Sequence, residues 1–280
     1  MSFKDILKKF KEKFLKFWRS DSGKISLIRD ILIALIVVLI ILTALWAYTG
    51  QWFSTPMVAI ETGSMMHPNE PFGRLGTIDP GDMVLLVKVN KESDIVTYGA
   101  AKAQGKKGLK TYEDYGDVIV YKKYGDPNDE QIIHRAMCWI KYNEEYKTYT
   151  VEEYEVINET SINITELGIN NYKPHHSGYI TKGDNPFTNS ECDQIGGVCD
   201  EPVKLEWVSG KARGELPWIG TINLFFSDLT SGSFWDEEKE VTVNNVETDC
   251  LICLILLIAA LISIPITLDL YSYYRGKKEQ

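Results

Sequence analysis

Two long apolar runs stand out along the chain, one near each end. The first covers residues 31–47 and the second covers residues 250–268, and neither contains a charged residue. A helix needs roughly 20 apolar residues to cross the hydrocarbon core of a bilayer. Neither run has the amphipathic period of a helix that packs on a protein core. The pattern therefore predicts two transmembrane helices, over residues 25–50 and 250–270.

Between these runs the pattern is typical of β-structure. Short segments rich in β-branched and aromatic residues are separated by turn sequences such as "IDPGD" and "YGDPND". We therefore expect a mainly β fold, with one β-rich domain over residues 51–249 that is anchored by a helix at each end. The predicted strands lie within residues 83–89, 117–123, 131–142, 146–154, 178–183 and 208–226.

Two polar stretches interrupt the strand pattern and are expected to be insertions, near residues 90–115 and 155–177. The first contains the Gly- and Lys-rich run of residues 99–110, which predicts a surface loop. The second contains two glycosylation acceptor patterns, at Asn158 and Asn163. Both stretches are expected on the surface of the β-domain.

The first 24 residues form a basic segment. Apolar residues recur at helical spacing within residues 3–18, with lysines on the opposite face. This arrangement is typical of a helix that lies on a membrane surface. The apolar run that follows is too long for the core of a signal peptide, and no small-residue cleavage site comes soon after it. We expect a retained anchor.

Charge is distributed unevenly along the 280 residues. Basic residues are enriched before the first apolar run and in the tail of residues 271–280. Residues 31–249 contain 18 Lys and Arg against 33 Asp and Glu, a net charge of −15. The positive-inside rule then predicts that both termini are cytoplasmic and that the β-domain lies outside, or in the lumen of a eukaryotic endoplasmic reticulum. Such an acidic domain argues against nucleic acid and anionic lipid as its partners.

Three polar residues of the β-domain are candidates for chemistry. Ser64 lies in "ETGSMMHP", shortly after the first apolar run, and His134 lies on an apolar predicted strand. Asp184 lies in a Gly-Asp-Asn turn at the end of another predicted strand. Each has an ordinary structural explanation, as a turn serine, a core histidine and a turn aspartate. A serine nucleophile needs an adjacent base, and the G-x-S-x-G elbow of α/β-hydrolases is missing here.

The order of the motifs carries more information than any single motif. After the first apolar run come "TGSM", "IDPGDMVLLVKV", "YGDVIVY", "IIHRAM", "YITKGDNP" and "GELPWIGTINLFF". This series resembles type I signal peptidase, in the branch found in archaea and in the endoplasmic reticulum. The resemblance covers most of residues 31–226. It implies a membrane-bound serine endopeptidase that removes signal peptides from secretory pre-proteins.

The resemblance assigns roles to particular residues. It implies Ser64 as the nucleophile and His134 as the general base, where the bacterial branch uses a lysine. Asp184 matches the first acid of the "KGDN" motif. The family has its second acid six residues later, where this chain has Ser190. Asp193 is the preferred substitute for this second acid. Asp193 is also preferred to Asp184 as the residue that orients His134.

Further expectations follow from the same resemblance. Asp200 is an additional candidate for the second acid. The hydroxyl of Thr62 and the main-chain N–H of Ser64 are expected to stabilise the oxyanion. The family commonly has proline three residues after its serine, whereas this chain has His67 there and Pro68 next. Neither a metal nor an organic cofactor is required. The expected partners are signal peptides, membrane lipid and, as a candidate, the translocation channel.

Two alternatives stay open, and one disulfide is predicted. The β-domain is either this peptidase, a related serine protease with another substrate, or a non-catalytic module such as an adhesin. Cys192 and Cys199 flank Asp193, and a disulfide between them would hold the acid loop in place. The Cys-x-x-Cys pair of Cys250 and Cys253 lies at the start of an apolar run with no histidine nearby, so we expect no metal site there.

Overall fold

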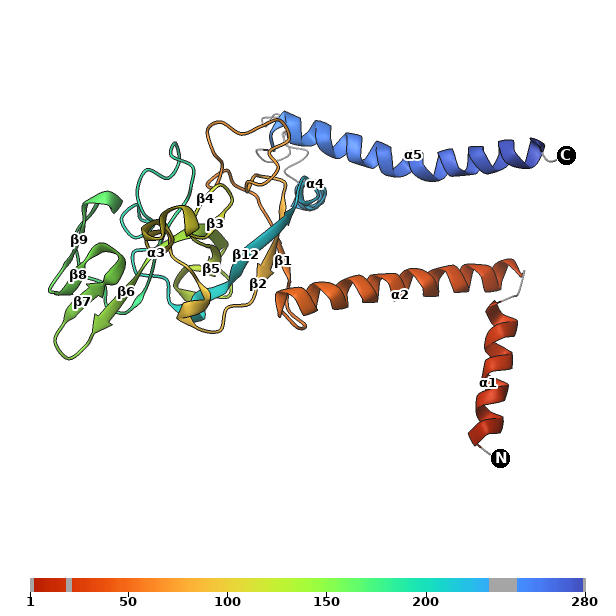
Figure 1. Ribbon diagram of the computed structural model, residues 1–280, viewed down its shortest axis with the longest axis horizontal. Helices are drawn as coiled ribbons and strands as arrows, with labels where there is room; N and C mark the ends of the chain where they lie inside the picture. The colour runs from red at the N-terminus through yellow and green to blue at the C-terminus, as the bar shows by residue number, and fades with distance from the viewer. Residues whose placement is uncertain (1–2, 19–21, 232–245, 279–280) are drawn as a thin grey trace. The chain divides into compact units, whose positions relative to one another are not determined.

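The computed structural model describes residues 3–18, 22–231 and 246–278, and it divides into two compact units. The first unit is Met1–Phe53 and the second is Ser54–Gln280. The second unit contains a large antiparallel sheet, so the prediction of a β-rich fold is confirmed. Figure 1 shows the strands of this unit together with its long C-terminal helix α5.

The first unit consists of two helices, α1 (Phe3–Trp18) and α2 (Gly23–Thr49). Helix α2 has 27 residues and a length of about 40 Å, which exceeds the thickness of the hydrocarbon core. It ends where Gly50 takes a left-handed conformation, with φ of 69°, and its N–H donates to the carbonyl oxygen of Trp46. Helix α2 is therefore long and apolar enough to cross a membrane.

The main sheet of the second unit has eight strands in the order β1-β2-β12-β5-β6-β7-β8, and β11 pairs with β6 as well. Every pairing between these strands is antiparallel. The strands are β1 (Met57–Ala59), β2 (Met83–Val87), β5 (Val118–Lys122), β6 (Gln131–Asn143), β7 (Thr148–Val151), β8 (Val156–Glu159), β11 (Gly178–Lys182) and β12 (Val208–Leu216). Two small ribbons pair β3 (Lys110–Thr111) with β4 (Asp114–Tyr115) and β9 (Ile162–Ile164) with β10 (Ile169–Tyr172).

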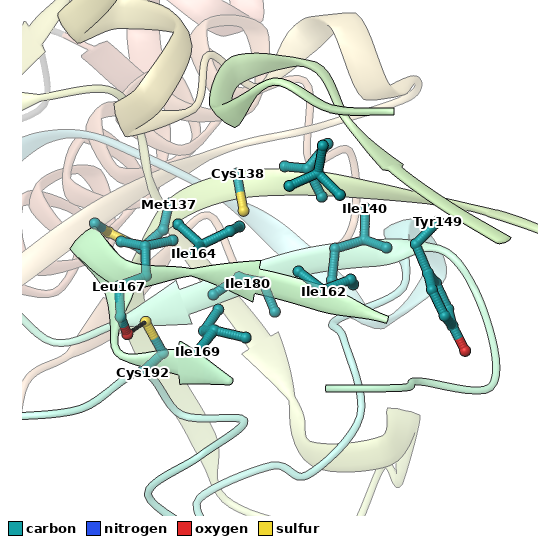
Figure 2. Close-up of a cluster of buried hydrophobic side chains, with 12 residues drawn as sticks. Met137, Cys138, Ile140, Tyr149, Ile162, Ile164, Leu167, Ile169, Ile180 and Cys192 are labelled. Carbon is teal, nitrogen blue, oxygen red and sulfur yellow. Dashed lines mark hydrogen bonds between the residues drawn. The ribbon is translucent and has the colours of Figure 1, made fainter. Parts of the chain in front are cut away.

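Strand β6 separates two groups of buried side chains because successive residues of a strand point to opposite faces. Ile133 packs with Val118 and Met65 on one face. Ala136 packs with Ile119 and Tyr179 on the other. A third cluster, drawn in Figure 2, lies farther along β6 and includes Cys138, Ile140 and Ile180. These clusters fix the position of the first half of β6, which carries His134.

The prediction of a strand over residues 208–226 is wrong in its second half. Strand β12 ends at Leu216, and helix α4 (Gly220–Ser231) follows. The chain turns at Trp218, which has a φ of 63° and donates its N–H to Asp82. Proline at position 217 cannot donate a hydrogen bond to a sheet, so the strand stops there.

The run of residues 99–110 is not a plain surface loop. It begins in helix α3 (Tyr98–Ala103), whose N-terminus is capped by the hydroxyl of Thr97 accepting from the N–H of Ala100. Gly99 and Ala101 are buried. A Cβ atom added at Gly99 would lie 2.9 Å from the Cβ atom of Glu153, so only small residues allow this close packing.

The stretch of residues 155–177 is likewise more ordered than an insertion loop. The ribbon of β9 and β10 lies within it and contributes Ile162, Ile164 and Ile169 to the cluster in Figure 2. The asparagines of the two acceptor patterns, Asn158 and Asn163, are exposed. This stretch is therefore part of the core, with its polar side chains facing solvent.

The C-terminal helix α5 (Thr248–Lys278) is the second helix that is long and apolar enough to span a membrane, over Thr248–Leu268. Asp249 in its first turn accepts a hydrogen bond from the N–H of Gly73 at 2.9 Å and lies 3.6 Å from the guanidinium of Arg74. The loop after Ser64 is thus joined to the start of α5. Both apolar helices are compatible with membrane anchoring.

Candidate active site

Ser64 lies in the turn that follows β1. The next residue, Met65, is 1% exposed and packs with Ile60 in a buried cluster. The N–H of Met66 donates to the carbonyl oxygen of Gly63 at 3.2 Å and closes the turn. A buried residue on one side and a tight turn around it give the partly exposed Ser64 a defined position.

His134 lies on β6, opposite Ile119 of β5, and is 4% exposed. Its Nδ1 atom lies 2.8 Å from Oδ1 and 2.7 Å from Oδ2 of Asp193. Asp193 follows β11 in the chain, and its N–H donates to the carbonyl oxygen of Thr181 at 2.8 Å. The structure therefore joins two residues that are 59 positions apart in the sequence.

Two further donors hold the carboxylate of Asp193. The hydroxyl of Tyr121 donates to Oδ2 at 2.8 Å, and the hydroxyl of Thr181 donates to the same atom at 2.6 Å. Burial alone would raise the pKa of Asp193. The hydrogen bonds and charge of His134, with the two hydroxyl groups, outweigh burial and keep this pKa below its usual value. Asp193 is therefore an ionised acceptor for the imidazole at neutral pH.

A cavity of about 610 Å³ brings Ser64 and His134 to one site. Since Asp193 occupies Nδ1, Nε2 is the ring nitrogen left to act on a group in this cavity. No hydrogen bond joins the Ser64 hydroxyl to the His134 ring in the part of the chain that the structure describes. Catalytic hydrogen bonds are often formed only when substrate binds. Thr62 also lines the cavity and is exposed.

The walls of this cavity include two strand edges. Strand β1 pairs with β2 on one side, and its other edge has no strand partner among the described residues. Residues 131–134 of β6 pair with β5, whereas β11 pairs only with residues 135–140. Residues 58–64 and 130–134 line the cavity from these two sides. An extended segment can hydrogen-bond to such free edges.

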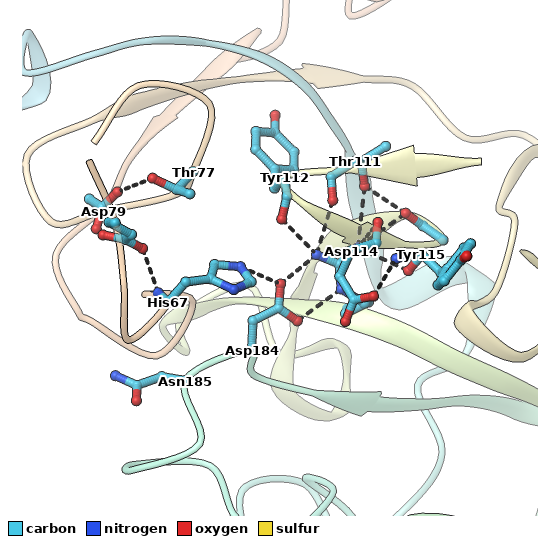
Figure 3. A network of polar contacts seen from close by, with 12 residues as sticks. His67, Thr77, Asp79, Thr111, Tyr112, Asp114, Tyr115, Asp184 and Asn185 are labelled. Carbon is cyan, nitrogen blue, oxygen red and sulfur yellow. Dashed lines mark hydrogen bonds and ion pairs between the residues drawn. The ribbon is translucent and has the colours of Figure 1, made fainter. Parts of the chain in front are cut away.

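Asp184 lies on the other side of β6 from Asp193. Its carboxylate accepts from Nε of Arg135 at 2.8 Å and from the Nη2 atom as well. His67 lies nearby, with Nε2 at 3.5 Å from Oδ2. Arg135 also donates to main-chain carbonyls such as that of Tyr115. Figure 3 shows His67, Asp184 and Tyr115 of this network. Asp184 therefore makes its contacts with Arg135, and Asp193 makes its contacts with His134.

The electrostatics of Asp184 follow from these contacts. Burial would raise the pKa of Asp184, but the nearby His67 and the hydrogen bonds and charge of Arg135 hold it below its usual value. In return, the contact with the Asp184 carboxylate raises the pKa of His67 above that of an ordinary histidine. The third candidate acid, Asp200, is exposed, and its main chain bonds to Tyr124 and Tyr172.

The predicted disulfide is absent, because Cys192 and Cys199 are both free thiols. Cys192 packs in the cluster of Figure 2, with its sulfur 3.6 Å from the carbonyl oxygen of Leu167. Cys199 packs in the cluster that contains Tyr121. The acid loop is held by other bonds, since the N–H groups of residues 198 and 199 both donate to the carbonyl oxygen of Asp193.

Sequence reasoning missed Tyr121 and Thr181, and it assigned no role to Arg135. The pairing of residues on neighbouring strands would have revealed Tyr121 and Thr181. Tyr121 lies two residues from Ile119, which pairs with His134, and Thr181 pairs with Ala136, two residues from His134. Paired residues share a face of the sheet, so both hydroxyl groups lie on the face of His134. The register of the strands has to be known before this signal can be used.

Comparison with known proteins adds no relative. No protein-family model matches this chain, and no curated protein matches it. Among the residues that the structure describes, no group of three or more His, Cys, Asp or Glu side chains is arranged to hold a metal ion. The cavity brings Ser64 together with the hydrogen-bonded pair of His134 and Asp193.

Proposed function

We propose that the protein is a membrane-bound serine endopeptidase that removes signal peptides from secretory pre-proteins. The observation that carries the proposal is the hydrogen-bonded pair of His134 and Asp193 on a cavity that Ser64 also lines. A nucleophile, a base and an acid that orients the base are the parts that serine catalysis requires.

In the proposed mechanism the Ser64 hydroxyl attacks the scissile carbonyl carbon and Nε2 of His134 accepts its proton. The carboxylate of Asp193 holds Nδ1–H and stabilises the imidazolium that forms. Tyr121 and Thr181 keep that carboxylate ionised and aligned. His134 then gives the proton to the leaving amine, and water hydrolyses the acyl-enzyme by the same route.

Stabilisation of the oxyanion is assigned to the N–H of Ser64 and the hydroxyl of Thr62. Thr62 lines the cavity two residues before Ser64, so both groups come from the same turn. One oxyanion donor typically contributes about 3–4 kcal/mol to the transition state.

The substrate is proposed to bind as an extended strand between the free edges of β1 and β6. Apolar side chains of these walls, such as Ala59 and Ile132, would contact its small side chains. The cleavage site of a membrane-inserted signal peptide is expected to emerge at the membrane surface, where the apolar helix α5 would anchor the β-domain. We propose cytoplasmic termini and an external β-domain because Lys and Arg are concentrated at the two ends of the chain.

Cleavage of a secretory precursor by the full-length protein in detergent tests this proposal. Wild type is expected to release the signal peptide, and Ser64→Ala is expected to lose activity by about 10⁵- to 10⁶-fold. His134→Ala should lose nearly as much, because the members of such a unit act together. Ser190→Ala, which changes an exposed serine in the loop after Asn185, is the matched control.

The outcomes separate the alternatives. Full activity of Ser64→Ala or His134→Ala would overturn the mechanism. Cleavage at a bond other than the signal-peptide junction, identified by mass spectrometry of the products, would indicate a protease with another substrate. A wild-type protein that cleaves no precursor and reacts with no serine-directed inhibitor would favour the non-catalytic module.

A further inference from the structure

The turn of residues 183–185 touches both candidate catalytic segments, although it contains neither the nucleophile nor the base. Its contacts with the Ser64 segment are made by main chain and by one side chain. The N–H of Asn185 donates to the carbonyl oxygen of Ser64 at 2.9 Å. Nδ2 of Asn185 donates to the carbonyl oxygen of Gly63 at 2.7 Å.

The side-chain amide of Asn185 is oriented by bonds at both of its ends. While Nδ2 donates to Gly63, Oδ1 accepts from the N–H of Phe187 at 3.0 Å. Reversing the amide would place a donor against a donor and an acceptor against an acceptor. Asn185 is therefore committed to one orientation, in which it holds the carbonyl before Ser64.

The approach of the turn to Ser64 is close enough to require glycine at position 183. A Cβ atom built at Gly183 would lie 2.6 Å from the carbonyl oxygen of Ser64. That oxygen cannot withdraw easily, because it accepts the N–H of Asn185. Gly183 thus allows the close approach in which Asn185 holds the carbonyl oxygens of Gly63 and Ser64.

Asp184 connects the same turn to the strand that carries the base. Its carboxylate is bound by Arg135, the residue after His134, and the guanidinium of Arg135 is 1% exposed. Figure 3 shows Asp184 directed toward this network with Asn185 beside it. The turn therefore links Ser64 to β6 through hydrogen bonds and one buried ion pair.

We propose that residues 183–185 form a clamp that sets the position of Ser64 relative to His134, with Asn185 as its positioning residue. This inference rests on the proposed function, since positioning matters only if Ser64 reacts. A main chain that is misplaced by about 1 Å can lower a rate by about 100-fold. Asn185 does not line the cavity, so its loss should lower kcat and leave KM unchanged.

The test compares Asn185→Ala and Asn185→Asp with Phe187→Ala in the full-length protein. Phe187 lies in the same loop, and its side chain is 82% exposed. We expect Asn185→Ala to lower kcat on a secretory precursor by about 10- to 100-fold, with KM changed less than twofold. Asn185→Asp should be worse, because a carboxylate would face the carbonyl oxygen of Gly63. Phe187→Ala should match wild type.

Amide hydrogen exchange supplies a readout that does not depend on catalysis. Loss of the clamp should accelerate exchange in residues 60–66 while residues 135–140 of β6 stay protected as in wild type. Unchanged exchange, or faster exchange with unchanged kcat, would overturn the positioning role. If exchange is faster in the Asn185 variants but the wild-type protein cleaves no precursor, the clamp is supported and the proposed peptidase activity is not. A variant that loses protection in β6 has unfolded, and Asn185→Ser then replaces it in the same test.

Discussion

The carboxyl groups of Asp193 and Asp184 lie on opposite faces of β6 with little exposure to solvent, and each contacts a different one of two adjacent residues of that strand. Asp193 is bound by His134, and Asp184 is bound by Arg135. Both carboxyl groups have a pKa below the usual value despite burial. An imidazole exchanges a proton near neutral pH, whereas a guanidinium stays charged. The first pair is therefore suited to proton transfer and the second to holding structure in place.

The alternation of side chains along a strand explains the division. Because His134 and Arg135 are consecutive, their side chains point to opposite faces of the sheet, and a separate acid contacts each of them. Thr181 pairs with Ala136 and lies on the face of His134. Asp184, three residues later, contacts Arg135 on the opposite face. Two acids close in sequence are thus separated by a sheet.

Of substitutions at the two acids and their neighbours, Asp193→Asn should have the largest effect, because it removes the charge that stabilises the imidazolium. We expect kcat to fall by about 10⁴-fold, less than for Ser64→Ala, because nucleophile and base remain. Single-turnover cleavage of a precursor measures this loss. Asp200→Asn changes an exposed acid of the same loop and should retain wild-type activity. An active Asp193→Asn protein would show that the His134 pair is structural, like that of Arg135.

Asp184→Asn should act mainly on stability. It would leave the guanidinium of Arg135 buried without a countercharge, which typically costs about 3–5 kcal/mol. Since the pKa of Asp184 is depressed, its contribution is present above about pH 4 and is lost as pH falls through the folded pKa. Thermal unfolding in detergent near pH 7 measures the loss, with the exposed Asp129→Asn as control. Equal unfolding temperatures for the two variants would contradict the assignment.

Glu215 extends the comparison to a carboxyl group that has no cation partner among the described residues. Burial, with the charge of Asp82, raises the pKa of Glu215 to about 7, although the N–H of Gly76 donates to it. A raised acid pKa lowers stability as pH rises from the unfolded value toward the folded one. We therefore expect Glu215→Gln to stabilise the protein by about 1 kcal/mol near pH 8, after allowing for solvent screening, and by little near pH 5.

Unfolding temperatures of wild type and Glu215→Gln at the two pH values check this expectation. Glu144→Gln, at an exposed position, should show no such difference. If the difference in unfolding temperature between Glu215→Gln and wild type were the same at both pH values, Glu215 would be ionised without cost in the folded protein.

The smallest effect is expected from His67→Gln. The pKa of His67 is raised mainly by its contact with the Asp184 carboxylate, so its stabilising contribution is full below about pH 6.5 and is lost as pH rises through the folded pKa. The variant should be less stable than wild type by under about 1 kcal/mol near pH 5.5, and by less near pH 8.5. Chemical denaturation at both pH values resolves this. A larger deficit at the higher pH would mean that His67 contributes as a neutral side chain.

Much of the fold could be predicted from local patterns. Strands β2, β5, β7 and β11 lie within the predicted segments, β6 extends one residue beyond its segment, and both apolar helices lie where uncharged runs predict them. Helix α4 was missed because a short apolar segment, "INLFF", suits a strand or a helix equally. The prediction of a disulfide was wrong because the short sequence distance between Cys192 and Cys199 does not reveal that their side chains pack in different clusters.

Sequence by itself determined the residue types at the site and the order in which they occur. Ser64 in its turn, His134 on an apolar strand and two later aspartates are local features, and local patterns reveal them. Only the tertiary structure decided which aspartate contacts His134 and which contacts Arg135. That choice depends on the register of β11 against β6 and on the packing of the acid loop, both set by contacts between residues far apart in the chain. The same contacts place Asn185 against Ser64, although 121 positions separate them.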